Sequence, residues 1–189
     1  MFGDIEHPVA GVEYKKMGDL ATYVNGCAFR PEEWGNVGLP IVRIQNLTGT
    51  SDEFNYFNGD YPHKAELKNG DVLISWSASL GVYLWNGGKA ILNQHIFKVE
   101  FDKVPILKQF FMYAVGYKLD EMCGLSHGST MKHIVRKDFD NTRIAYPRMD
   151  LQERFASLVQ QSDKSKFELK KALSELTATY KRIIKENIG

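Results

Sequence analysis

Residues 150–187 read DLQERFASLVQQSDKSKFELKKALSELTATYKRIIKEN, and this stretch contains neither proline nor glycine. Within it, apolar and small residues recur in alternating steps of four and three, with one extra four-residue step after Leu169. This spacing is carried by Leu151, Phe155, Leu158, Ser162, Ser165, Leu169, Leu173, Leu176, Tyr180 and Ile183. The pattern predicts one long helix with a heptad-like seam and a local phase shift. At ~1.5 Å rise per residue, such a helix is about 57 Å long.

A helix of this length cannot bury its seam against one compact domain alone. We therefore expect the seam to contact another long helix, from a second copy of the chain or from a different chain. The residues expected to carry this contact are Leu169, Leu173, Leu176, Tyr180 and Ile183. A single amphipathic helix folded back on the rest of the chain is the alternative interpretation.

The residues before the helix differ from it in composition. From Tyr14 to Pro147 the chain is dense in glycine, aromatic residues and short apolar runs. β-branched or aromatic segments bounded by turn residues predict strands at 39–44, 71–76 and 95–101. The turn signal Asn86-Gly87-Gly88 predicts a hairpin between strands at 82–85 and 89–92.

An internal helix is also predicted, from Pro105 to about Met122, because proline favours the first helical turn. Its apolar face is expected to contain Leu107, Phe110, Phe111, Ala114 and Met122. The sequence therefore predicts the α+β fold class, with a strand-rich mixed domain over residues 1–149 and a long C-terminal coiled-coil helix over residues 150–189.

The bulk composition does not indicate a partner. The chain has 189 residues, 24 Lys and Arg against 23 Asp and Glu, and a net charge of +1. Any argument for nucleic acid must therefore rest on where the charges lie. Cys27 and Cys123 form no CxxC pair and indicate reduced thiols. The N-terminus has no signal-peptide pattern, and no apolar run is long enough to span a membrane, so we expect a cytoplasmic protein that makes no membrane contact.

The sequence contains none of the familiar catalytic motifs. It has no GxxxxGK[ST] loop, no GxGxxG turn after a strand, no GxSxG elbow and no HExxH helix. Cys123, His127 and His133 lie close together in the sequence, but no fourth ligand follows at a usual zinc spacing. We therefore expect no catalytic residues, no metal site and no enzymatic activity in this chain.

A basic segment lies between Ser126 and Arg148, where five Lys and Arg residues stand against two Asp residues. Glycine and hydroxyl residues in it would let the backbone approach an anion and donate hydrogen bonds to phosphate. The candidate DNA-binding residues of this segment are Ser129, Thr130, Lys132, His133, Arg136 and Lys137. A capped helix start with an ordinary basic surface is the alternative.

Polar residues also follow the predicted strands. Arg can read guanine, and Gln or Asn can read adenine, through paired hydrogen bonds in the major groove. The candidate DNA-reading residues at these strand ends are Arg43, Gln45, Asn46, Ser77, Ser79, Asn93 and Gln94. Ordinary hydrogen bonding within loops is the alternative for all of them.

These segments, in this order, resemble the target-recognition domain and following long helix of the specificity subunits of type I restriction–modification systems. The matching stretches are 14–20, 25–29, 39–47, 70–77 with Gly81, 92–96 and 128–134, followed by Pro147, Gln152 and Phe155. The resemblance covers nearly the whole chain. It implies recognition of a short double-stranded DNA sequence, one half of a two-part target, by a non-catalytic subunit. It also implies that the loop 128–133 faces DNA and that the 70–77 match is chiefly structural.

The resemblance further implies partners. Methyltransferase subunits would dock around the long helix, bind S-adenosylmethionine and modify adenine, and restriction subunits with ATP would join them. No cofactor is expected on this chain itself. Full-length members carry two recognition domains and two long helices, whereas this chain has one of each. Because residues 1–4 resemble the junction after the first long helix, the chain is expected to be either the second half of a longer subunit or a half-subunit that self-associates.

Two other function classes are weighed against this one. A protein-interaction adaptor would work through its C-terminal coiled coil and bind no DNA, which the basic segment argues against. An enzyme with an unrecognised site is disfavoured by the missing motifs. A salt-dependent DNA gel shift distinguishes DNA recognition from the adaptor.

Overall fold

A computed structural model describes residues 9–125 and 134–188 of the chain. The chain divides into two compact units, Met1–Met149 and Asp150–Gly189. In the first unit the strands are β1 (Val12–Lys16), β2 (Thr22–Asn25), β3 (Leu39–Val42), β4 (Asn55–Phe57), β5 (Glu66–Leu67), β6 (Asp71–Ser75), β7 (Gly81–Trp85), β8 (Ala90–Leu92), β9 (Ile96–Glu100) and β10 (Arg143–Pro147). The helices are α1 (Met17–Leu20), α2 (Ile44–Thr48), α3 (Lys108–Leu125), α4 (Arg136–Asn141) and α5 (Met149–Ile188), with short 3-10 turns at Pro31–Glu33 and His63–Ala65.

Two of the sheets have four strands each, and the one with the longer strands is called the larger sheet. Its strand order is β2-β9-β6-β7, and all adjacent strands in it are antiparallel. Along β6, Val72 and Ile74 face one apolar cluster while Leu73 faces another. This alternation follows from the two-residue period of a strand, and it means that β6 is buried on both faces. The strands predicted at 71–76 and 95–101 are confirmed as β6 and β9.

The smaller sheet has the order β4-β3-β8-β5, with β3 and β8 parallel. The predicted hairpin of 82–85 with 89–92 is therefore wrong. β7 pairs with β6 in the larger sheet, whereas β8 pairs with β3 and β5. The chain bends at Gly87, but all three residues of β8 are buried. A strand buried on both faces belongs in the middle of a sheet, between two neighbours, and its pairing is set by distant parts of the chain.

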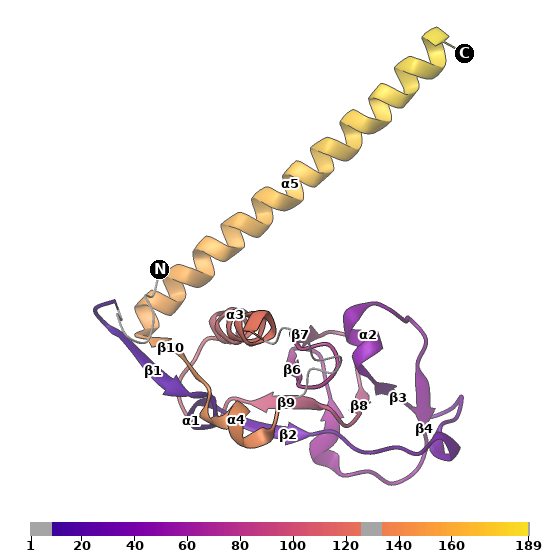
Figure 1. The fold of residues 1–189 in the computed structure, drawn as a ribbon. Coiled ribbons are helices and arrows are strands. Elements are labelled where there is room, and N and C mark those ends of the chain that lie inside the picture. Colours follow the sequence, from indigo (N-terminus) through magenta and orange to yellow (C-terminus); the bar gives the residue numbers. More distant parts are fainter. Residues whose placement is uncertain (1–8, 126–133, 189) are drawn as a thin grey trace. The chain divides into compact units, whose positions relative to one another are not determined.

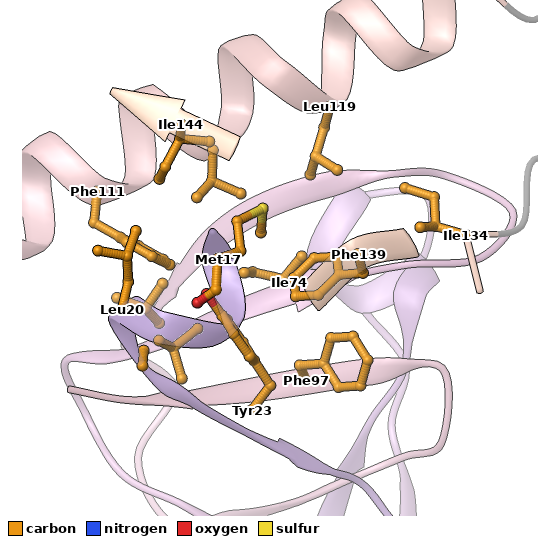
Figure 2. Close-up of a cluster of buried hydrophobic side chains, with 14 residues drawn as sticks. Met17, Leu20, Tyr23, Ile74, Phe97, Phe111, Leu119, Ile134, Phe139 and Ile144 are labelled. Carbon is orange, nitrogen blue, oxygen red and sulfur yellow. The ribbon is translucent and has the colours of Figure 1, made fainter. Parts of the chain in front are cut away.

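One core lies between the larger sheet and the helices α1, α3 and α4 (Figure 2). The helix α3 places Phe111, Val115 and Leu119 on this core at four-residue spacing. This helix begins at Lys108, so the predicted start at Pro105 is wrong by three residues. The Pro105 carbonyl instead accepts a hydrogen bond from the Tyr146 hydroxyl at 2.9 Å. The second core fills the space between the two sheets.

The first and last strands of the domain pair with each other. β1 runs antiparallel to β10, with Val12 opposite Pro147 and Lys16 opposite Arg143 (Figure 1). The second unit is the single helix α5, which confirms the predicted long helix. Its predicted seam residues Leu169, Leu173, Leu176, Tyr180 and Ile183 are between 50% and 70% exposed. In the part of the chain that the structure describes, no helix is long and apolar enough to cross a membrane.

Candidate nucleic-acid interface

Polar segments that are far apart in the sequence meet at one end of the two sheets. β3 and β8 end there side by side, and the Asn93 N–H donates to the Val42 carbonyl at 3.0 Å. The last residue of β6, Ser75, lies opposite the first residue of β9, Ile96. We call the residues at this end, 43–46, 77–79 and 93–95, the loop surface. The fold thus brings together the three strand-end groups that the sequence predicted as DNA-reading residues.

The structure separates the roles of the residues that follow β3. The strand ends at Val42, and residues 44–48 form the helix α2 where the sequence predicted a strand as far as residue 44. Asn46 Oδ1 accepts the Arg43 N–H at 3.0 Å, and its Nδ2 donates to the Ser51 and Glu53 carbonyls at 3.2 and 2.8 Å. Asn46 therefore uses both ends of its amide to hold the loop together.

Arg43 and Gln45 are engaged differently. Both are half-buried. The Gln45 carbonyl accepts the Thr50 N–H at 3.0 Å, but its side-chain amide has no hydrogen-bond partner within residues 9–125 and 134–188. The guanidinium carbon of Arg43 lies 5.1 Å from the centre of the Trp34 ring. Within the described residues, neither the Gln45 amide nor the Nη groups of Arg43 are used in a hydrogen bond, whereas Arg43 Nε is buried.

The other two loops of this surface have unusual backbones. Ala78 and His95 adopt φ angles of 59° and 71°, which are uncommon for residues other than glycine. Buried Ser75 donates its hydroxyl to the Ser79 carbonyl, which closes the turn between β6 and β7. Strained backbone of this kind occurs often at functional sites and is held by the surrounding structure.

The polar groups on these loops are partly accessible. Ser77 and Asn93 are half-buried, and Ser79 and Gln94 are exposed. The Gln94 N–H lies 2.7 Å from the Cys27 carbonyl and 2.8 Å from Asn93 Oδ1. The Gln94 side-chain amide has no hydrogen-bond partner among the residues that the structure describes. A backbone fixed in this way presents the side chain of Gln94 to solvent.

The segment 25–27 lies against this surface and depends on a glycine. A Cβ added at Gly26 would lie 2.0 Å from the Asn93 carbonyl oxygen, which is closer than real contacts allow. The next residue, Cys27, pairs with Asn93 in an isolated parallel bridge. Burial raises the pKa of the Cys27 thiol, and nearby Lys64 acts in the opposite direction.

The basic segment is only partly described. Ser129, Thr130, Lys132 and His133 lie outside the described residues. The segment re-enters at Ile134, whose N–H donates to the Trp76 carbonyl at 3.1 Å, and the Trp76 N–H in turn donates to the His95 carbonyl at 3.2 Å. The start of α4 is therefore joined by hydrogen bonds to the loop surface.

The two basic residues at the start of α4 differ. Arg136 donates to Asp140 at 2.7 Å and to the Tyr23 carbonyl at 3.1 Å, and its guanidinium carbon lies 5.0 Å from the Phe97 ring centre. Lys137 is exposed, and its ammonium group makes no hydrogen bond or ion pair within the described ranges. Of the two side chains, that of Lys137 is therefore the one whose charge is not engaged within the described residues.

The sequence analysis did not select Trp34, which is 37% exposed beside Arg43. A signal was present, since this tryptophan stands in a polar loop between Glu33 and Gly35. Among the described residues, no group of three or more His, Cys, Asp and Glu side chains is placed to hold a metal ion.

A family model described as the type I restriction modification DNA specificity domain matches residues 10–177. The chain belongs to this family. The type I restriction enzyme EcoBI specificity subunit of Escherichia coli is 26% identical over 160 residues, covering 81% of this chain and 33% of that protein. The chain thus spans about a third of the length of this curated relative.

Two solved structures share the fold. The HsdS subunit from Thermoanaerobacter tengcongensis aligns with a TM-score of 0.64 and 18% identity, over 86% of this chain and 40% of that one. A structure described as showing complex assembly and conformational transition of the type I R-M system aligns with a TM-score of 0.70 and 20% identity, over 94% of this chain and 44% of that one. Identities this low support the common fold alone.

Proposed function

We propose that this chain recognises a short sequence of double-stranded DNA as a specificity component of a type I restriction–modification complex. The observation that carries the proposal is the convergence of Arg43, Gln45, Asn93 and Gln94 at one end of the two sheets, from segments about fifty residues apart. Their amide and guanidinium groups are those that read base edges in the major groove. Family membership supports DNA as the ligand.

Within this proposal the residues divide by role. Arg43, Gln45 and Gln94 contact base edges, with Ser77, Ser79 and Asn93 beside them. Lys137, together with Ser129, Thr130, Lys132 and His133, contacts phosphates, which supplies affinity without sequence preference. Asn46 and Arg136 hold the loops that carry these groups.

The chain is proposed to catalyse nothing itself. Methyltransferase and restriction subunits would carry the chemistry, with S-adenosylmethionine and ATP bound on them. The exposed seam of α5 is proposed to pair with a second long helix, and pairing of two copies through antiparallel helices is the simplest closed arrangement. Such a pair would read a two-part palindromic target, because each copy presents the same surface in inverted orientation.

The test is selection from a library of DNA duplexes with a randomised centre, using the purified full chain. We expect one short motif to be enriched, with binding that weakens steeply as salt rises. The chain is also co-expressed with the methyltransferase of its own restriction–modification system. Sequencing of the methylated sites should then return the same motif. If the chain binds no duplex at low salt but captures a helical partner, the adaptor function replaces this proposal.

A further inference from the structure

Trp34 stands in a loop whose backbone is fixed on both sides. Its N–H donates to the Pro31 carbonyl at 3.2 Å. The next residue, Gly35, exchanges two hydrogen bonds with Tyr56, at 2.8 and 3.0 Å, and this bridge ties the loop to β4. The indole is nevertheless 37% exposed, although a tryptophan is usually well covered. The loop therefore presents a large flat ring from a rigid base.

That ring supports Arg43. The guanidinium carbon lies 5.1 Å from the ring centre, within the range of a cation–π contact. The Arg43 backbone N–H is bound by Asn46 Oδ1 at 3.0 Å, so the residue is held at both ends. Its Nε is buried and has no hydrogen-bond partner in residues 9–125 or 134–188. A cation–π contact uses no N–H hydrogen bond, and the Nη groups of Arg43 make none within the described residues, so these two groups keep their donors.

From this geometry we propose that Trp34 is a positioning residue for DNA readout, which fixes the Arg43 guanidinium for paired hydrogen bonds to one guanine. The inference rests on the proposed function, because it assumes that Arg43 reads a base. Arginine has a long side chain with much rotamer freedom, and a site that orders it before binding loses less entropy on contact. The indole supplies that order without occupying the donors.

The charge of the loop favours this indirect role. Glu32 and Glu33 precede Trp34 directly, and both are exposed. With Arg30 counted, residues 30–34 carry a net charge of −1, so the loop gains no net attraction to the phosphate backbone. Its effect should reach the DNA through Arg43.

The experiment compares two duplexes: one that carries the motif enriched by the wild-type chain and a shuffled duplex of the same composition. We expect Trp34→Ala to weaken binding to the enriched duplex about tenfold and binding to the shuffled duplex less than about twofold. Trp34→Phe keeps an aromatic face and should restore most of the affinity. Val37→Ala, in the same loop at a residue that is 72% exposed, is the matched control and should bind like the wild type.

The double variant separates positioning from direct contact. If Trp34 acts through Arg43, Trp34→Ala should add almost nothing in an Arg43→Ala background. Additive losses would mean that Trp34 touches DNA itself, and an equal loss on both duplexes would mean general damage; either result overturns the inference. If Arg43→Ala weakens only the enriched duplex while Trp34→Ala binds like the wild type, the inference fails and the proposed function stands. If the wild type enriches no motif, both fail.

Discussion

Nε of Arg136 lies 2.7 Å from Oδ2 of Asp140, one helical turn further along α4. The same guanidinium donates to the Tyr23 carbonyl and makes a cation–π contact with Phe97, so Arg136 joins α4 to β2 and β9. We expect Arg136→Ala to lower the free energy of unfolding by about 1–2 kcal/mol, since a backbone hydrogen bond and a cation–π contact are lost while the ion pair is half exposed. Urea titration measures this. Unchanged stability with a smaller salt dependence of DNA binding would instead place Arg136 on the DNA.

Lys137 should behave in the opposite way. Its exposed ammonium is proposed to contact a phosphate, so Lys137→Ala should weaken binding to every duplex alike. The slope of log affinity against log salt should fall by about 0.9. Lys68→Ala is the matched control, because this exposed lysine precedes β6, at the other end of the sheet. Equal effects of the two variants would show a general charge effect rather than a contact.

Gln45 and Asn46 are neighbours with different expected phenotypes. Asn46→Ala removes three hydrogen bonds within the loop and should cost about 1–2 kcal/mol of stability. Gln45→Ala should leave stability unchanged and cost ~1–3 kcal/mol of binding to the enriched duplex alone. Thermal unfolding of both variants measures the change in stability, and titration with the enriched duplex measures the change in binding. A Gln45→Ala variant that binds normally would remove this side chain from base readout.

The seam of α5 predicts a change of oligomeric state. Leu173 and Leu176 are 64% and 67% exposed, so each presents apolar area to a partner helix. Leu173→Glu combined with Leu176→Glu should turn a dimer into a soluble monomer that binds a half-site weakly. Light scattering at a chain concentration of tens of micromolar measures the mass of the species in solution. A wild-type chain that is monomeric under these conditions would contradict self-association.

Glu66 gives a prediction about pH. The Tyr61 hydroxyl donates to its carboxylate at 2.6 Å and Lys89 lies 3.1 Å away, and these contacts, the hydrogen bond first, lower the pKa of Glu66. The ionised form is therefore favoured in the folded state. Its stabilisation is present above the unfolded pKa of about 4.3 and is lost as the pH falls through the lower folded value. We expect Tyr61→Phe to raise the pKa of Glu66, and Lys89→Met to raise it as well, by NMR titration of the carboxyl. An unchanged pKa in Tyr61→Phe would contradict the assignment.

Local patterns were enough to predict the long helix and the strands β6 and β9. The seam of α5 repeats over the whole element, and β6 and β9 combine β-branched residues with flanking turns. The partner predicted for the short strand β8 is wrong, because a turn signal such as Asn86-Gly87-Gly88 does not decide which strands pair. Trp85 Nε1 donates to the Gly88 carbonyl, and Asn69 accepts the Gly88 N–H. The chain leaves this turn toward β3, a partner that local reasoning does not reveal.

For the candidate site, the sequence predicted the residue types but not their neighbours. The sequence predicts the same role for Arg43 and Asn46, because both side chains can read bases. The structure distinguishes them, since the Asn46 amide makes three hydrogen bonds inside the loop while Arg43 makes a cation–π contact with Trp34. Spacing cannot show this, because the ring lies nine positions away across an irregular loop. The left-handed backbone at Ala78 and His95 could not be predicted from the sequence either, since neither residue is a glycine.

The pairing of β1 with β10 has a consequence for how the chain can change. Val12 lies opposite Pro147, so the domain's point of entry and its point of exit are adjacent. A domain with neighbouring ends can be excised and transplanted between other segments without altering the spacing of its host. A hybrid with junctions at Gly11 and Arg148 would keep the β1–β10 ladder whole and exchange both sheets and every loop in one step. If the proposed function holds, recombination at those two points would change the target sequence while the long helix that follows stays the same.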